Sequence, residues 1–248
     1  MLVRDIQAKS ILSKSCVFDY SLNPYTGCQF GCSYCYARFM TRFSGHKEHW
    51  GEFVDVKINA STLLEKEIKI KRRGKVWISG VCDPYQSIEA GENLTRKCLE
   101  ILVNNNWPIC IQTKSQLVLR DIDLIRLGKD VEVGMTITTG DEEIRRLFEP
   151  KATPIIERVN AISQLHNTGI KTFAMIAPLL PGAEKLVTVL RDNVDYIIID
   201  KMNYHYVDWV YRKYGLGDAK SRYFMTHLCN ELVSGFQKQG LKCLVLFE

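Results

Sequence analysis

The sequence predicts an α/β fold built around parallel strands. Segments with the two-residue period of strands alternate with segments of helical period along most of the chain. The 248 residues fit one large domain, and no Pro/Gly-rich linker, low-complexity tract or internal repeat divides them. Strands separated by helices of roughly ten to fifteen residues are typical of βαβ units. We therefore expect about six such units in a single domain over residues 1–248.

The first half of the chain contains a leading strand followed by strand–helix pairs. Asn59–Arg73 has apolar residues at helical spacing and meets a helix stop at Gly74. The elements expected here are a strand at Val17–Leu22, a helix at Asn59–Arg73, a strand at Lys75–Gly80, a helix at Glu92–Asn105, a strand at Pro108–Thr113 and a helix near Val118–Leu127.

The second half continues the alternation. Thr153 and Pro154 are typical of an N-cap followed by proline at the first helical position, and the helix that they begin stops at Gly169. The other elements expected here are strands at Val131–Thr139, Lys171–Pro178, Val194–Asp200 and Leu241–Phe247, and helices at Glu142–Phe148, Glu184–Arg191, His205–Tyr214 and Arg222–Lys238.

The composition excludes several classes of protein. With 46% hydrophobic and 25% charged residues, the chain resembles an average globular protein rather than a disordered or fibrous one. Thirty-three basic and twenty-eight acidic residues give a net charge of +5, which permits a polyanionic partner without demanding one. No apolar run approaches the roughly 20 residues of a membrane span, and the N-terminus lacks a secretory signal. We expect a cytoplasmic protein with no membrane partner.

Three of the nine cysteines, Cys28, Cys32 and Cys35, fall within eight residues. Their thiolates favour zinc, copper(I) or iron–sulfur clusters. Structural zinc requires a fourth ligand, which His46 or His49 would supply in a Cys3His site of a non-catalytic module. These two histidines lie in a polar stretch and are expected to face solvent. Three cysteines without a fourth also fit a four-iron cluster with one open iron.

The cysteine segment carries a family resemblance. Cys28 to Cys35, with Tyr34 as the aromatic residue, matches the C-x3-C-x-Φ-C signature of the radical S-adenosylmethionine (SAM) superfamily. The flanks Asn23–Cys28 and Cys35–Arg38 resemble the spore photoproduct lyase-like group, also described as DNA repair photolyase-like. Three later segments resemble the same group in the same order: Ser79–Glu89, Thr113-Lys114 and Thr136–Arg158. The resemblance weakens in the C-terminal part of the chain.

The resemblance implies a partial (β/α)6 TIM-like barrel with its active site at the C-terminal ends of the strands. Its core would cover about residues 16–200, with C-terminal helices and a last strand over about 201–248. Cys28, Cys32 and Cys35 would hold a [4Fe–4S] cluster whose open iron binds SAM. An electron donor such as flavodoxin or ferredoxin would trigger cleavage of SAM to a 5′-deoxyadenosyl radical. The implied substrate is a nucleic-acid base; a protein, peptide or metabolite is the alternative.

The resemblance also implies four residues that bind SAM through its adenine or its polar groups. Tyr34 would lie against the adenine. Lys114, at the end of a strand, would bind the SAM carboxylate. Thr136 and Thr138 alternate at another strand end, and one of them would hydrogen-bond SAM where the lyase has a serine.

A second group of SAM contacts is implied at one loop and one helix. Gly80 permits close approach of the backbone, and Asp83 would take the acidic role toward the SAM amino group in the loop that replaces the superfamily's Gly-Gly-Glu segment. Arg158 would either touch SAM or form a structural ion pair with Glu149, and for Glu149 we favour the structural role.

Cys82 and Tyr36 are the candidates for catalytic residues. Spore photoproduct lyase uses a loop cysteine to return a hydrogen atom to the product radical, with tyrosines beside the last cluster cysteine as relay partners. Here Cys82 lies in the corresponding loop, and Tyr36 follows Cys35 directly. Cys82 immediately precedes Asp83, whereas the lyase cysteine lies a few residues earlier relative to its Asp.

The C-terminal segment Tyr204–Tyr214 is rich in aromatic residues and contains Arg212 and Lys213. Aromatic rings with nearby cations suit stacking of nucleobases. The segment also fits a helix with one apolar face, made by Tyr206, Val207, Val210, Tyr211 and Tyr214. We favour the helix with its face buried in the core.

Overall fold

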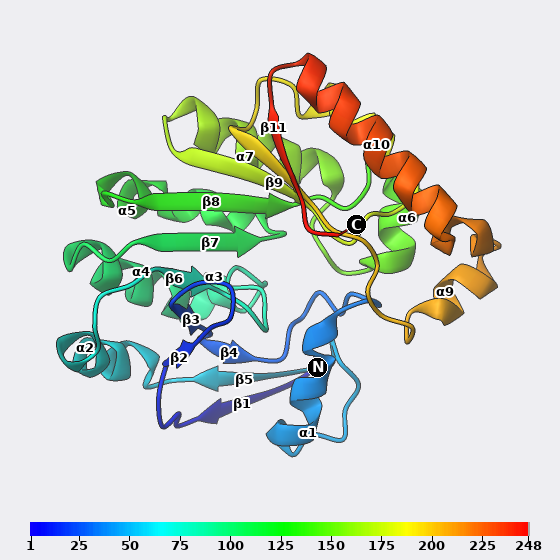
Figure 1. Ribbon diagram of the computed structural model, residues 1–248. Helices are drawn as coiled ribbons and strands as arrows, with labels where there is room; N and C mark the ends of the chain where they lie inside the picture. The colour runs from blue at the N-terminus through cyan, green and yellow to red at the C-terminus, as the bar shows by residue number, and fades with distance from the viewer. Residues whose placement is uncertain (248) are drawn as a thin grey trace. The chain divides into compact units, whose positions relative to one another are not determined.

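The computed structural model describes residues 1–247 (Figure 1), and its contacts divide the chain into two units. The first unit consists of Met1–Gly31 and Tyr36–Val133. The second consists of Cys32–Cys35 and the chain from Gly134 onward. The expected single-domain organisation stays a prediction.

The first unit contains the parallel strands that the sequence predicts. Strand β3 (Tyr20–Leu22) pairs in parallel with β6 (Val76–Ile78), and β6 pairs in parallel with β7 (Ile109–Thr113). Strand β2 (Leu12–Lys14) adds to β3 in the antiparallel direction. Leu22 is in register with Ile78, and Ile78 with Ile111, so these strands end at one edge. That edge places the residues after Leu22, Ile78 and Ile111 close together.

A second, three-stranded sheet in the first unit was not expected from the sequence. Its order is β1 (Leu2–Ile6), β5 (Phe53–Lys57) and β4 (Tyr25–Thr26). β1 runs parallel to β5, and β4 runs antiparallel to it. Strand β4 leads directly into Gly27 and Cys28. Gly27 has φ 92°, and a Cβ atom there would lie 2.3 Å from the Phe53 carbonyl oxygen. The tight packing of this sheet therefore requires glycine just before Cys28.

The helices of the first unit follow the predicted order with shorter bounds. The amphipathic pattern of Asn59–Arg73 forms α2 over Ala60–Ile70, and Lys71 is already extended. The helix predicted at Glu92–Asn105 is divided by Asn93, whose φ is 57°. The helices and 3-10 helices are η1 (Tyr36–Met40), α1 (Thr41–Ser44), α2, α3 (Glu89–Glu92), α4 (Leu94–Asn104), η2 (Gln116–Asp121) and α5 (Ile122–Leu127).

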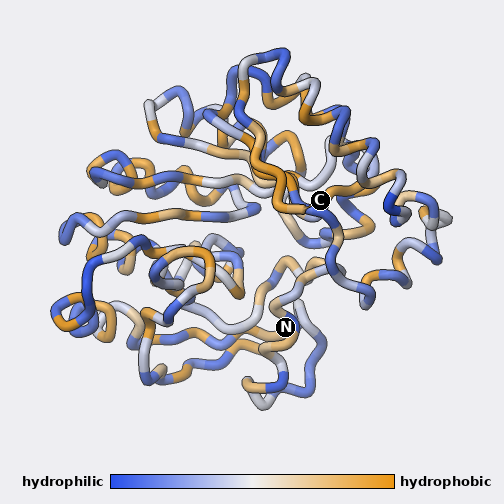
Figure 2. Tube along the Cα trace, in the orientation of Figure 1, coloured by the Kyte–Doolittle hydropathy of each residue, from blue (hydrophilic) through white to orange (hydrophobic). Residues whose placement is uncertain are grey.

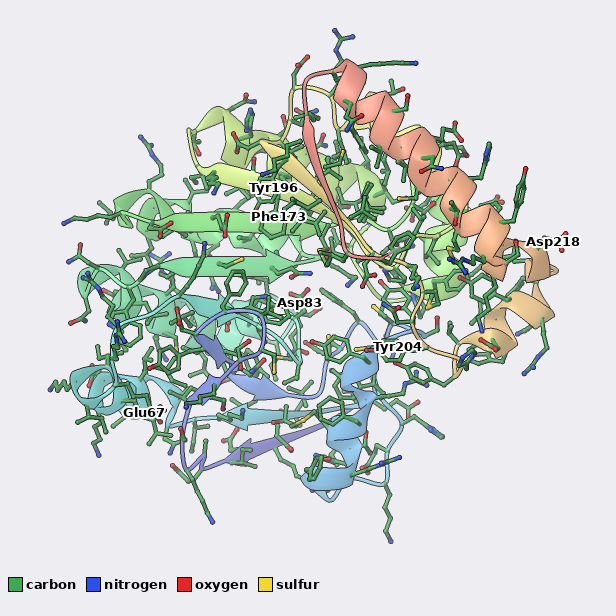
Figure 3. The ribbon with its side chains drawn as sticks, in the orientation of Figure 1. Glu67, Asp83, Phe173, Tyr196, Tyr204 and Asp218 are labelled. Atoms are coloured by element: carbon green, nitrogen blue, oxygen red, sulfur yellow. The ribbon has the colours of Figure 1, made fainter. Side chains whose placement is uncertain are left out.

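Strand β8 (Val131–Thr136) passes from the first unit into the second, where the strand order continues as β9 (Lys171–Ile176), β10 (Tyr196–Ile199) and β11 (Lys242–Val245). β9, β10 and β11 are parallel. Phe173 of β9 is the register partner of Tyr196 of β10, and their rings stack 5.1 Å apart (Figure 3). These contacts hold the last predicted strands in place.

The helices of the second unit include two whose predicted bounds are confirmed: α6 (Glu142–Phe148) and α10 (Arg222–Lys238). Hydrophobic and hydrophilic residues alternate along α10 (Figure 2), whose apolar side buries Leu228, Leu232 and Phe236. The other elements are α7 (Ile155–Asn167), η3 (Ala183–Lys185), α8 (Leu186–Val189), α9 (Asp208–Lys213) and η4 (Gly217–Lys220).

Two sequence-based expectations about exposure are tested by this fold. Val207, Val210 and Tyr211 are buried as predicted, whereas Tyr214 is exposed because α9 ends at Lys213. The apolar neighbours of Cys98, Cys110 and Cys243 in the sequence predict small core residues; Cys98 and Cys110 are buried, whereas Cys243 is only partly buried. Within residues 1–247, no helix combines the length and the apolar character that crossing a bilayer requires.

Candidate functional site

The strand ends of the first unit hold the loop that contains Gly80, Cys82 and Asp83. Asn23, directly after β3, is the anchor of this loop: its Oδ1 accepts hydrogen bonds from Ser79 Oγ at 2.6 Å and from the Val81 amide at 2.9 Å. The roles of Asn23 and Ser79 were not predicted from the sequence, although Asn23 lies in the flank Asn23–Cys28 that carries the family resemblance. The shared strand edge explains the contact, because it brings together residues that are 56 positions apart.

Cys82 donates its thiol proton within the same loop. Its Sγ lies 2.9 Å from Ser79 Oγ. Because the single hydroxyl hydrogen of Ser79 is given to Asn23, Ser79 Oγ accepts from the Cys82 S–H. Burial raises the pKa of the Cys82 thiol to about 11. The side chain also packs against an apolar cluster that contains Tyr25 and Leu94. Cys82 is therefore a protonated thiol at neutral pH.

Asp83 (labelled in Figure 3) connects the loop after β6 to the end of β7. Its Oδ1 accepts from Thr113 Oγ1 at 2.6 Å and from the Tyr85 amide at 2.9 Å, and its Oδ2 accepts from the Lys114 amide at 2.7 Å. Burial raises the pKa of this carboxyl group above its usual value. The structure thus brings together Asp83 and Lys114, two of the predicted SAM contacts.

Tyr36 belongs to the same part of the first unit. Its hydroxyl donates to the Gly80 carbonyl oxygen, so that it contacts the loop that carries Cys82. A Cβ atom on Gly80 would lie 3.3 Å from the Trp77 ring, which makes this position tight for any larger residue. Of the two predicted catalytic residues, Cys82 therefore lies in this loop and Tyr36 contacts it.

In the second unit, Tyr34 is anchored to a buried ionic network. Its hydroxyl donates to Glu149 Oε1, which also accepts from Thr138 Oγ1 at 3.1 Å. Arg158 Nη1 lies 2.6 Å from Glu149 Oε2 and donates to the Thr136 carbonyl oxygen at 3.0 Å. Burial and the Glu149 carboxylate hold the pKa of Tyr34 well above its usual range. The network unites the predicted residues Tyr34, Thr136, Thr138 and Arg158.

Glu149 is at the centre of this network. Its ion pair with Arg158 is the structural role that the sequence favours for Glu149. The side chains of Glu149 and Arg158 are fully buried. Arg158 Nη2 is also buried and has no hydrogen-bond partner among the described residues. A buried donor of this kind is satisfied by an acceptor of a bound ligand or by water.

Backbone contacts hold the segment that carries Cys32 and Cys35. The amide of Ser33 donates to the Phe148 carbonyl oxygen at 2.8 Å, and Tyr206 donates its hydroxyl proton to the Tyr34 carbonyl oxygen at 3.0 Å. The Tyr204 and Tyr206 rings stack 5.2 Å apart. Burial and the charges of Asp200 and Cys35 raise the pKa of Tyr204 (labelled in Figure 3). The sequence predicts Tyr206 on the apolar face of a helix, but it precedes α9 and contacts Tyr34 instead.

One of the two histidines, His46, differs from the expectation. His46 is buried, with only 6% of its surface exposed, so the prediction that it faces solvent is wrong. Its Nε2 lies 2.7 Å from Asp55 Oδ1 and its Nδ1 lies 3.2 Å from Glu48 Oε2, while its ring stacks on Phe53. Both ring nitrogens of His46 are thus engaged by carboxylates. His49 is exposed as predicted.

Comparisons with known proteins agree with the motif. The model of the radical SAM superfamily matches residues 22–185. The chain belongs to the radical SAM superfamily. An uncharacterized protein of Methanocaldococcus jannaschii is 36% identical over 192 residues, which cover 77% of this chain and 70% of that protein. A radical SAM Nα-GlyT isomerase of Pseudomonas phage M6 is 24% identical over 162 residues, covering 64% of this chain and 33% of the isomerase.

Solved structures of other proteins share the fold. Spore photoproduct lyase in complex with a dinucleoside spore photoproduct matches with a TM-score of 0.70 at 15% identity, covering 99% of this chain and 82% of the lyase. Streptococcus suis SuiB bound to S-adenosylmethionine matches with a TM-score of 0.61 at 15% identity, covering 92% of this chain and 50% of SuiB. The predicted fold class, an α/β chain of the partial TIM-barrel type, is confirmed.

The donor set of the cysteine segment suits the iron–sulfur cluster that the superfamily implies. Three thiolates on one short segment match the soft ligands that iron in such clusters prefers. Cys28 and Cys32 are buried, and Cys35 is partly buried. Within residues 1–247, no group of three or more His, Cys, Asp or Glu side chains forms a preassembled metal site. The fit therefore rests on the chemistry of the three thiols, and their assignment as ligands stays a prediction.

Proposed function

We propose that this radical SAM enzyme holds a [4Fe–4S] cluster on Cys28, Cys32 and Cys35 and acts on a base of nucleic acid. The observation that carries the cluster assignment is the C-x3-C-x-Φ-C motif inside the matched residues 22–185. When bound, the cluster and SAM supply a 5′-deoxyadenosyl radical that removes a hydrogen atom from the substrate. The protein's task is to bind, orient and exclude water.

Two groups of residues, one in each unit, bind SAM in this proposal. In the first unit, Gly80, Asp83 and Lys114 bind its amino and carboxylate groups. The Asp83 carboxylate already accepts hydrogen bonds from the Thr113 hydroxyl and the Lys114 amide, so it fixes the positions of these two residues. This arrangement supports the proposal because a preorganised loop loses little entropy when SAM binds.

In the second unit, Tyr34 lies against the adenine, and Thr136, Thr138 and Arg158 complete the SAM site. Arg158 offers a buried Nη2 donor that lacks a hydrogen-bond partner among the described residues. An acceptor on the bound cofactor would remove the cost of that unsatisfied group.

Cys82 returns the hydrogen atom at the end of the reaction, with Tyr36 as its relay partner. The raised pKa of Cys82 supports this role because only the protonated thiol carries a hydrogen atom to give. Ser79 accepts the S–H hydrogen bond and so orients it. Tyr36 contacts the Gly80 carbonyl oxygen in the same loop.

The case for a nucleic-acid substrate rests on charge, aromatic residues and fold. The chain has a net charge of +5. Tyr204, Trp209 and Tyr214 are exposed large aromatic residues in the segment after β10, where Arg212 and Lys213 are also exposed. Such side chains suit single-stranded or flipped bases. The lyase with the similar fold was solved with a dinucleoside photoproduct.

An anaerobic assay tests the proposal. The protein is reconstituted with iron and sulfide, reduced with dithionite and incubated with SAM, and 5′-deoxyadenosine is quantified beside a Cys32→Ala control. We expect a brown protein whose SAM cleavage is lost in the control. A colourless protein with stoichiometric zinc and no cleavage would overturn the cluster assignment.

Oligonucleotide binding tests the substrate class separately. We expect a labelled single-stranded oligonucleotide to bind at low salt and to weaken steeply as salt rises, because phosphate contacts release counterions. Absence of binding at low salt, in protein that cleaves SAM, would leave the radical chemistry standing and favour a protein, peptide or metabolite substrate.

A further inference from the structure

The helical segment after the last cluster cysteine exposes an unusual surface. η1 and α1 together cover Tyr36–Ser44, and Ala37 is their only buried residue. Phe39 and Phe43 are 43% and 76% exposed, and their rings meet edge to face with centroids 6.3 Å apart. Arg42 is exposed between them in the sequence. Phe39, Arg42 and Phe43 are called the docking patch below.

Packing inside the molecule does not account for the docking patch. A single exposed apolar residue is ordinary, but two phenylalanines that contact each other at i and i+4 make a continuous apolar surface. Residues 36–44 contain two arginines and no acidic residue. An apolar centre beside positive charge is the composition of a protein-binding surface with an acidic partner.

The chain places this surface close to the cysteine segment. Tyr36 follows Cys35 by one peptide bond, and helical rise separates Tyr36 from Phe43 by about 10–14 Å. The proposed reaction begins only when one electron from outside reduces the cluster. A reductant that docks on the helix next to Cys35 would have a short path for that electron.

We propose that Phe39, Arg42 and Phe43 form the docking surface for an acidic electron-carrier protein of the flavodoxin or ferredoxin type. The inference rests on the proposed function, because only a cluster on Cys28, Cys32 and Cys35 requires the electron. In the step concerned, the reduced carrier gives one electron to the oxidised cluster and is itself oxidised by one electron, and no atom or proton is transferred. A small patch suits this role, since redox partners meet through interfaces below about 1,200 Å².

A nucleic acid is the competing occupant, and the observations favour the carrier. Polyanion binding gains from a run of cations that follows the phosphates. The patch instead has one exposed arginine at the edge of an apolar pair. Proximity to Cys35 matters for electron transfer and has no special value for holding a phosphate backbone.

The test compares two reductants on the full-length reconstituted protein. An acidic flavodoxin with its NADPH-dependent reductase supplies electrons through protein contact, and dithionite supplies them without it. The variant is Arg42→Glu/Phe43→Ala. The matched control is Ile70→Ala/Arg73→Glu, which changes an apolar residue with 82% exposure and an exposed arginine near the end of α2 in the same unit. Affinity for oxidised flavodoxin is measured by calorimetry, which needs no turnover.

We expect the patch variant to bind flavodoxin at least tenfold more weakly and to lose at least tenfold of its flavodoxin-driven 5′-deoxyadenosine formation. Its dithionite-driven rate should stay within twofold of the wild type, and the control should match the wild type in every assay. Rising salt should weaken flavodoxin binding to the wild type.

Three results would overturn the inference: unchanged flavodoxin affinity in the patch variant, an equal loss with both reductants, or loss of oligonucleotide binding while flavodoxin affinity stays intact. The last would assign the surface to nucleic acid. If the wild type forms no 5′-deoxyadenosine with dithionite, the proposed function fails, and the calorimetric comparison still decides whether the patch binds the carrier.

Discussion

Cys82 illustrates how one side chain acquires its chemistry from its neighbours. The hydroxyl proton of Ser79 is committed to Asn23, so the thiol must be the donor in the contact between Ser79 and Cys82. Burial then disfavours the thiolate. A loop cysteine that would otherwise be a reactive nucleophile is kept as S–H.

We predict that Cys82 resists alkylation near pH 8. A pKa of about 11 leaves it with little thiolate there, and its reactivity should rise with pH toward that value. Peptide mapping after iodoacetamide treatment measures the rate, with exposed Cys16 as the internal reference. We expect Cys82 to react at least tenfold more slowly than Cys16 at pH 8; equal rates would contradict the partly buried, protonated thiol.

We also predict that Gly27→Ala destabilises the protein by about 2 kcal/mol or more, because alanine at φ 92° is strained and its Cβ would press on the Phe53 carbonyl oxygen. Urea denaturation measures the change. Gly45→Ala is the matched control: it also has a positive φ, of 69°, but a Cβ there meets nothing within 4 Å. Equal losses in the two variants would show that the contact with Phe53 adds nothing.

At the scale of elements, one buried ion pair joins several parts of the second unit. Glu149 follows α6, Arg158 lies in α7, Thr136 ends β8, and Tyr34 lies between two of the three clustered cysteines. Each of these elements supplies a hydrogen bond or a charge to the network. The position of the Cys32–Cys35 segment therefore depends on contacts made by residues more than a hundred positions away.

We predict that Glu149→Ala lowers the free energy of unfolding by about 3–5 kcal/mol, because Arg158 is then left as an uncompensated buried charge. The double variant Glu149→Leu/Arg158→Met should lose less free energy of unfolding than the sum of the losses in Glu149→Leu and in Arg158→Met. Arg146→Met, which removes an exposed ion pair with Glu142 on α6, should cost no more than about 1 kcal/mol. Urea denaturation followed by circular dichroism gives all these values, and additive losses would argue against a coupled pair.

At the scale of the whole molecule, the two units contribute different residues to the proposed function. The first unit supplies Cys28, the Gly80–Asp83 loop and Lys114, and the second supplies Cys32, Cys35 and the Glu149 network. Binding of SAM to the reconstituted enzyme would thus be linked to the stability of the folded chain.

We predict that SAM at about 100 times its dissociation constant stabilises the reconstituted protein by about 2.7 kcal/mol, which appears as a rise in the midpoint of thermal unfolding. The measurement is anaerobic calorimetry with and without SAM. Cys32→Ala, which removes one proposed cluster ligand, should show a much smaller rise. An equal rise in the variant would mean that SAM binds independently of the cluster.

Local patterns in the sequence predict the elements whose residues contact each other within a few positions. Helices α6 and α10 have their predicted bounds because amphipathic periodicity and capping are encoded in neighbouring residues. Strands β1 and β5 were not predicted. Leu2 pairs with Phe53, which is far away in the sequence, and no local pattern in either strand indicates that the two strands pair. The helix after Glu92 begins later than predicted because Asn93 takes a left-handed conformation.

By itself, the sequence determined the superfamily, the α/β class and the three candidate cluster cysteines, since each is recorded in short-range spacing. Only the tertiary structure decided that His46 is buried against Asp55, that Asn23 orders the Cys82 loop and that Glu149 holds Tyr34. These contacts join residues that chain spacing does not relate, and their partners are selected by which strand ends meet and which polar groups must be satisfied once water is excluded.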